Sequence, residues 1–263
     1  MECTCFPWLL NKEKIMKKKI LGLLLVVGIV AGVFAGCGNS NTSENNGNTA
    51  NKTAKARTID EIKKAGKIKI GVFSDKNPFG YVDENGKVQG YDVYFAKRIA
   101  KDLLGSEDAV DFVYLEAASR VEYLKSAKVD ITLANFTVTD ERKEQVDFAL
   151  PYMKVALGVV SPEKATIKDV KDLKGKKLIV VKGTTAETYF SKNYPDIDLV
   201  KFDEYQEAYD ALLDGRGDAF STDNTEVLAW AKQNKGFTVG VESLGDTDTI
   251  APAVQKGNKE LLD

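Results

Sequence analysis

Hydrophobic and polar residues alternate in several short stretches of the chain, and this alternation predicts β-strands. Apolar side chains occupy every second position at 68, 70 and 72 and again at 129, 131 and 133. Three further short stretches, at 112–115, 177–181 and 219–222, are also apolar enough to form strands. The pattern therefore predicts at least five strands, three in the first half of the chain and two in the second.

Between these strands, hydrophobic residues recur three or four positions apart, which is typical of amphipathic helices. The clearest example has Phe95, Ile99 and Leu103 on one face. Shorter helices are predicted around residues 121–124, 186–190, 205–213 and 227–231. Strands and helices thus alternate twice, and the apolar stretch between the two halves is expected to be extended. The order predicts an α/β protein with two lobes joined by extended crossovers.

The N-terminal region has the three parts of a secretory signal. Three lysines at 17–19 precede an uncharged apolar stretch at 20–33, and small residues follow. The apolar stretch is shorter than the roughly 20 residues that a transmembrane helix needs. We therefore expect a cleaved signal peptide, with an uncleaved membrane anchor as the alternative.

The residues just before Cys37 resemble a bacterial lipobox, which implies cleavage before Cys37 and a lipid on its thiol. We expect residues 16–36 to be the lipoprotein signal peptide and residues 1–15 to be a spurious extension ahead of the true start at Met16. Residues 37–57 are rich in Asn, Thr, Ser and Gly, and such a segment cannot bury enough apolar surface to fold. We interpret them as the lipidated cysteine and a flexible linker.

Composition excludes several kinds of chemistry. The 263 residues include no histidine, so triads, metal sites and proton shuttles that need histidine are excluded. No cysteine follows residue 37, which excludes disulfides and thiol catalysis in the folded part. A formal net charge of −2 does not favour a nucleic-acid partner. We expect no metal or other cofactor.

Polar residues follow three of the predicted strands, at the strand ends where α/β proteins bind ligands. Thr137 and Arg142 come after the strand at 129–133, and their hydroxyl and guanidinium suit a carboxylate. The alternative is an ordinary helix start, capped by Thr139 or Asp140, with Arg142 in solvent.

The other two strand ends offer both signs of charge. Gly183, Thr184 and Thr185 lie between a strand and a helix, where free N–H groups favour an anion. Asp223 follows the last predicted strand and can accept hydrogen bonds from an ammonium. For both ends the alternative is a simple helix cap. Arg120 is either a solvated charge or a group that reads the far end of a ligand.

Several motifs, taken together, resemble the polar amino-acid solute-binding proteins of ABC importers. They are spread in order over residues 58–263, at 90–93, 128–131, 137–148, 151–152, 183–185, 217–219 and 222–224. Three stretches look most similar to the cysteine-binding members of that family, namely 79–83, 120–122 and 134–137. Aspartate- and glutamate-binding members are the alternative.

This resemblance implies a two-lobed, type II periplasmic-binding-protein-like fold. Lobe 1 is expected at 58–152, lobe 2 at 153–247, and a return to lobe 1 at 248–263. Because the family usually continues for some tens of residues, the chain is expected to be truncated at its C-terminus.

The implied function is capture of a free amino acid, with cysteine favoured, by a lipid-anchored monomer outside the cell. The anchor would hold it on the outer face of the cell membrane, or in the periplasm where the source has an outer membrane. The partners would be an ABC permease and its ATPase. No enzymatic activity is implied, although a dehydratase on the same scaffold is an alternative.

The resemblance also implies a role for each candidate residue. Arg142 and Thr137 match residues that hold the ligand α-carboxylate, and Thr184 and Thr185 match the turn that completes this contact. Asp223 matches the partner of the α-ammonium, which the backbone carbonyl of Asn135 also contacts.

Two aromatic residues and one arginine match positions around the ligand side chain. Phe73 and Phe136 correspond to the walls of the side-chain pocket, and Arg120 to an arginine that reads acidic side chains. Ala117 stands where many members have an aromatic ring, which argues against a large or cationic ligand such as arginine.

Overall fold

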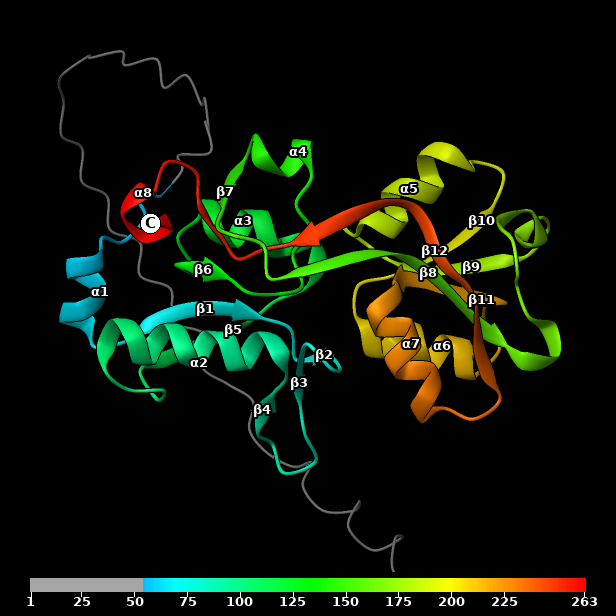
Figure 1. Ribbon diagram of the computed structural model, residues 1–263, viewed down its shortest axis with the longest axis horizontal. Helices are drawn as coiled ribbons and strands as arrows, with labels where there is room; N and C mark the ends of the chain where they lie inside the picture. The colour runs from blue at the N-terminus through cyan, green and yellow to red at the C-terminus, as the bar shows by residue number, and fades with distance from the viewer. Residues whose placement is uncertain (1–53) are drawn as a thin grey trace, which may run out of the picture. The chain divides into compact units, whose positions relative to one another are not determined.

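The computed structural model describes residues 54–263 (Figure 1). The predicted signal peptide, the lipidation site at Cys37 and most of the predicted linker lie outside the described residues. Within 54–263, no helix combines the length and the apolar character needed to span a membrane.

A mixed five-stranded sheet forms the centre of lobe 1. Its strand order is β5-β1-β6-β13-β7, in which β1 runs parallel to β5 and β6, while β13 runs antiparallel to β6 and β7. The strands are β1 (Ile68–Val72), β5 (Val110–Tyr114), β6 (Ile131–Thr132), β7 (Val146–Phe148) and β13 (Ala253–Gln255). The last strand comes from the C-terminal end of the chain, so lobe 1 is built from two separate segments.

Helices and a small second sheet complete lobe 1. The long helix α2 (Tyr91–Leu104) is confirmed and buries Val93, Ala96 and Ala100, while the predicted face residues Phe95, Ile99 and Leu103 are partly buried beside them. The small sheet consists of β2 (Asp75–Lys76), β3 (Gly80–Val82) and β4 (Val88–Gln89). The remaining helical segments are α1 (Ile59–Ala65), η1 (Ala117–Ser119), α3 (Arg120–Lys125), α4 (Asp140–Lys143) and α8 (Lys259–Leu262).

Lobe 2 contains the second five-stranded sheet, with the order β10-β9-β11-β8-β12. Strands β10 (Asp198–Phe202), β9 (Lys177–Val181) and β11 (Ala219–Asp223) are parallel, whereas β8 (Met153–Pro162) and β12 (Phe237–Ile250) are antiparallel to their neighbours. The helical segments are η2 (Glu163–Ala165), η3 (Val170–Leu173), α5 (Thr185–Asn193), α6 (Tyr205–Leu213) and α7 (Asn224–Gln233).

The chain passes between the lobes along two long antiparallel strands, β8 and β12 (Figure 1). They pair from Phe237 with Pro162 to Ile250 with Met153, and the register shifts at three places along the way. The prediction of two lobes joined by extended crossovers is therefore confirmed. The exact lobe boundaries at residues 152 and 247 stay predictions.

The predicted strand at 129–133 is shorter than expected. Strand β6 covers only Ile131–Thr132, although Asp130 and Leu133 still donate backbone hydrogen bonds to β1. Its other neighbour, β13, is itself only three residues long, so pairing on that side ends early.

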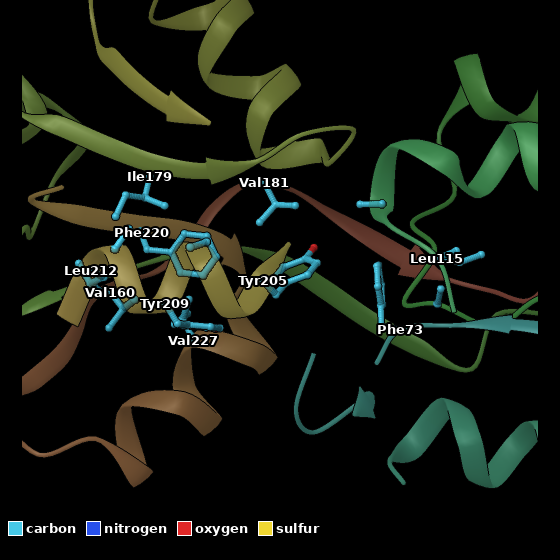
Figure 2. Close-up of a cluster of buried hydrophobic side chains, with 14 residues drawn as sticks. Phe73, Leu115, Val160, Ile179, Val181, Tyr205, Tyr209, Leu212, Phe220 and Val227 are labelled. Carbon is cyan, nitrogen blue, oxygen red and sulfur yellow. The ribbon is translucent and has the colours of Figure 1, made fainter. Parts of the chain in front are cut away.

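A hydrophobic cluster continues from one lobe into the other (Figure 2). Phe73 and Leu115 belong to lobe 1, and Tyr205 lies between them and the apolar side chains of lobe 2 in Figure 2. The rings of Phe73 and Tyr205 meet edge to face, with centroids 5.3 Å apart. The two lobes are therefore in direct apolar contact.

Candidate functional site

A small pocket lies between the two lobes, at the carboxyl ends of β6, β9 and β11. Its cavity volume is about 10 Å³, room for about one water molecule. Its lining residues are Arg120, Asn135, Thr137, Thr184, Thr185, Ala186, Tyr205, Thr222 and Asp223. Six of them are residues that the sequence predicts to contact a ligand, so the three predicted strand ends do meet in space.

Arg120 is buried in the wall of this pocket, with only 3% of its surface exposed. Its Nε donates a hydrogen bond to the carbonyl of Ala117 at 2.8 Å. Nη1 donates to the carbonyls of Ala134 and Asn135, each at 3.2 Å, and Nη2 donates to that of Gly183 at 2.9 Å. Burial lowers the pKa of the guanidinium. Arg120 is thus a buried cation held by backbone carbonyls of both lobes.

Arg142 is a second cation close to the first. Thr139 caps helix α4, as the alternative interpretation expected, but Arg142 is partly buried rather than fully solvated. Its Nη1 donates to the carbonyl of Thr137 at 2.7 Å, and its Nη2 donates to that of Gly183 at 2.9 Å. Burial and the neighbouring charge of Arg120 lower its pKa to about 9.

Both guanidinium groups lie against the ring of Phe136. The Cζ of Arg120 is 4.5 Å from the ring centroid, and the Cζ of Arg142 is 4.9 Å from it. Among residues 54–263, neither group forms an ion pair with an aspartate or glutamate. A buried and a partly buried cation without a carboxylate favour an anionic ligand, because a charge removed from water is stable only when it is paired.

Phe73 and Phe136 are both 1% exposed, but neither lines the small pocket. Phe136 and Arg142 line a larger neighbouring pocket, which shares Thr185 with the small one. Phe73 lines a third pocket between the lobes. These residues therefore support the walls around the candidate site, and Arg142 approaches it from the side of the larger pocket.

The beginning of helix α5 brings backbone N–H groups to the pocket. Thr184 is the N-cap: its hydroxyl accepts a hydrogen bond from the N–H of Glu187 and donates one to the carbonyl of Val181 at 2.6 Å. Thr185 is the first helical residue. The first N–H groups of a helix have no partner within it and attract negative charge. The turn is thus both an ordinary cap and a suitable anion site.

Gly183, which precedes this turn, allows the lobes to approach each other closely. Its φ is +73°, and a Cβ built there would lie 2.5 Å from the Cα of Ala118 in lobe 1. Any side chain at this position would therefore collide with lobe 1 and strain the backbone.

Asp223 supplies the opposite charge and is 5% exposed. It stands at the N-cap position of α7, but its side chain makes no capping hydrogen bond and instead accepts one from Nδ2 of Asn135. The Oδ1 of Asn135 is buried and has no hydrogen-bond partner among residues 54–263. The Asp223 carboxylate and this amide oxygen are both acceptors, and together they suit an ammonium.

Asn135 is held in an uncommon backbone conformation, with φ of +43°. Its N–H donates to Oδ2 of Asp92 at 2.8 Å, and the hydroxyl of Tyr152 donates to Oδ1 of the same carboxylate at 2.5 Å. Asp92 is fully buried, and burial raises its pKa. Asp92 therefore fixes the residue that contacts Asp223. The carbonyl of Asn135, expected to contact a ligand ammonium, accepts a hydrogen bond from Arg120.

The sequence interpretation missed three lining residues, Ala186, Tyr205 and Thr222. Ala186 and Thr222 are the immediate neighbours of predicted residues, so the strand-end argument extends to them. Tyr205 begins the helix after β10, a strand that the hydrophobic pattern did not predict. Within the described residues, no three histidine, cysteine, aspartate or glutamate side chains gather as metal ligands.

Comparison with known proteins identifies relatives over most of the chain. Residues 68–263 match the bacterial extracellular solute-binding proteins, family 3. The ABC transporter glutamine-binding protein GlnH of Bacillus subtilis is 33% identical over 246 residues, which cover 93% of this chain and 88% of that protein.

Two solved structures are more similar in sequence. The solute receptor for L-cysteine of Neisseria gonorrhoeae is 59% identical, with a TM-score of 0.77, and covers 78% of this chain and 84% of its own. The cysteine-binding protein of Campylobacter jejuni is 58% identical, with a TM-score of 0.76, and covers 78% of this chain and 82% of its own.

Proposed function

This chain belongs to the bacterial extracellular solute-binding proteins of family 3, and we propose that it captures free L-cysteine outside the cell for an ABC importer. Membership of this family and the two-lobed, type II fold make it an amino-acid receptor of ABC transport. The choice of cysteine, and each residue's role in binding it, are our proposals.

One observation carries the proposal: a small buried pocket has guanidinium groups on one side and a carboxylate on the other. Arg120 and Arg142 supply the positive charge from lobe 1, and Asp223 supplies the negative charge from lobe 2. The N–H groups at the start of α5 add donors on the positive side. A free amino acid carries both complementary charges.

A small amino acid can bind tightly only if its few polar groups are matched. Cysteine offers so few atoms that its binding free energy cannot exceed roughly −10 kcal/mol at about −1.5 kcal/mol per heavy atom. Micromolar binding already requires about −8 kcal/mol, so nearly every polar group of the ligand must be matched.

Two observations favour cysteine over an acidic amino acid. The relatives at 58–59% identity are receptors for cysteine. In addition, the hydrogen bonds of Arg120 to four backbone carbonyls leave it only one free N–H, which cannot bind a side-chain carboxylate through two donors.

Contacts from both lobes make closure depend on the ligand, because lobe 2 gains its contacts only when the lobes come together. The lobes would then present a closed surface to the permease. We further propose that the protein is a monomer, attached by a lipid on Cys37 to the outer face of the cell membrane. Where the source has an outer membrane, this location is the periplasm. Its partners would be the permease and its ATPase, and it would have no catalytic activity.

Isothermal titration calorimetry of the purified protein tests this proposal. Under reducing conditions, we expect micromolar or tighter binding of cysteine, and weaker binding of serine, alanine, glutamine, aspartate and glutamate. Arg142→Ala should weaken cysteine binding about a hundredfold or more, because it removes one partner of a buried charge pair. Arg98→Ala, on an exposed face of α2, is the control and should bind normally.

Three results would contradict the proposal. If no free amino acid binds, the receptor function itself is wrong. If aspartate or glutamate binds more tightly than cysteine, the assignment of the ligand is wrong and the acidic class replaces it. Consumption of the ligand during the titration, detected by chromatography, would point instead to an enzyme.

A further inference from the structure

An ion pair between the lobes lies behind the pocket wall. Lys76, on β2 of lobe 1, places its Nζ 2.7 Å from Oε2 of Glu226, on α7 of lobe 2. The side chains of Lys76 and Glu226 are 1% and 0% exposed. Neither residue lines the candidate ligand pocket. The binding role proposed above therefore does not explain why two charges are buried here.

Both ends of this pair contact residues that do line the pocket. The Lys76 ammonium lies 3.7 Å from the ring centroid of Tyr205. Glu226 accepts hydrogen bonds from the hydroxyls of Thr222 and Tyr209, each at 3.0 Å. Lys76 thus contacts the pocket wall at Tyr205, and Glu226 contacts it at Thr222.

The energetic consequence depends on whether the lobes are together. With the lobes in contact, each charge is removed from water and is compensated by the other. Lys76 and Glu226 belong to different lobes, so separation of the lobes parts the two charges and opens this interface to water. Loss of one partner therefore penalises the closed form, in which the other charge is buried, much more than the open form.

We propose that Lys76 and Glu226 form a positioning pair that determines ligand affinity without touching the ligand. The pair stabilises the contact between the lobes and fixes Tyr205 and Thr222 in the pocket wall. This inference rests on the proposed amino-acid binding. The inference differs from the proposed function in predicting that affinity depends on residues outside the pocket and that Lys76 and Glu226 act as one unit.

A double-mutant cycle tests the coupling. Cysteine affinity is measured by calorimetry for Lys76→Met, Glu226→Gln and the double variant. Each single variant should bind at least tenfold more weakly, whereas the double variant should recover to within about threefold of the wild type, because it buries no lone charge. The control is the exposed pair Lys101–Glu107, 3.0 Å apart and about half exposed. Lys101→Met, Glu107→Gln and their combination should each bind within about twofold of the wild type.

A second measurement reports the lobes directly. Spin labels on Tyr94→Cys of α2 and Leu213→Cys of α6, at positions that are 64% and 50% exposed, report the distance between the lobes by pulsed electron paramagnetic resonance. The three native cysteines, all at or before residue 37, are replaced by serine. With cysteine bound, the single variants should show a larger population at long distances than the wild type or the double variant.

The outcomes separate this inference from the proposed function. If the wild type binds no amino acid, the proposed function fails, and the pair is judged by the distance between the lobes of the ligand-free protein, which the single variants must lengthen. If the wild type binds but the single effects simply multiply in the double variant, the inference is wrong. It is also wrong if either single variant does not fold, because the pair would then stabilise a lobe and not the contact between lobes.

Discussion

Replacement of Asp223 by asparagine separates ligand binding from folding. Asp223 is 5% exposed, and among the described residues it is the carboxylate that lines the small pocket. In Asp223→Asn the new amide can still accept a hydrogen bond from Nδ2 of Asn135 through its oxygen. Its NH₂ group then faces the position proposed for the ligand ammonium. Both groups are hydrogen-bond donors, so they cannot bond to each other.

The expected loss follows from the burial of the charge. Truncation of one partner of a buried, hydrogen-bonded charge pair costs about 2–5 kcal/mol. At one factor of ten for about every 1.4 kcal/mol, the dissociation constant should rise roughly 30-fold to several thousand-fold. A ligand as small as cysteine has a ceiling of roughly −10 kcal/mol, so this loss would leave at best about −8 to −5 kcal/mol, which is micromolar to submillimolar binding.

The stability of the ligand-free protein should change far less. The variant keeps its hydrogen bond to Asn135 and loses only the charge assistance, a change of about 1 kcal/mol in the free energy of unfolding. Calorimetry with cysteine and urea unfolding without it measure the two quantities separately. Asp198→Asn, at an exposed position of β10 in the same lobe, is the matched control. Cysteine affinity within threefold of the wild type in Asp223→Asn would refute the role of Asp223 as the ammonium partner.

Two further substitutions test how the site is assembled. Gly183→Ala should fold but bind cysteine at least about tenfold more weakly, because its Cβ would collide with lobe 1 on closure and its φ of +73° is strained. Gly175→Ala is the control, since its φ is +72° but no atom lies within 4 Å of its Cβ, and calorimetry should find normal affinity. Asp92→Ala removes the acceptor of the hydrogen bond from the Asn135 N–H, so Asn135 loses support and affinity should fall about tenfold. Unchanged binding would contradict this positioning role, and Asp102→Ala on the exposed face of α2 is its control.

Much of the fold follows from the hydrophobic pattern, because the pattern reflects local burial. The alternation at 68–72 and the four-residue spacing of α2 predicted both elements, and the structure has them at Ile68–Val72 and Tyr91–Leu104. The strand-end argument explains why Thr184 and Asp223 meet, since β9 and β11 are neighbouring parallel strands of one sheet. Thr137 follows β6 of the other sheet and joins them because the two lobes face each other.

Features that depend on distant partners could not be predicted in this way. Lys76 is a charged residue in a two-residue strand, and the pattern gives no sign that it is buried. Its burial depends on Glu226, which is 150 positions later in the sequence. The left-handed conformation of Asn135 likewise depends on the Asp92 carboxylate from another element. Both cases involve polar contacts between segments that only the three-dimensional fold brings together.

The apolar cluster that Phe73, Leu115 and Tyr205 continue across the two lobes has a thermodynamic consequence (Figure 2). If these side chains separate in the unliganded protein, ligand capture removes their surface from water, and much of the area dehydrated on binding then belongs to the protein itself. Such dehydration lowers the heat capacity. The enthalpy of capture must therefore become steadily more negative on warming, by more than a molecule of seven heavy atoms can account for alone.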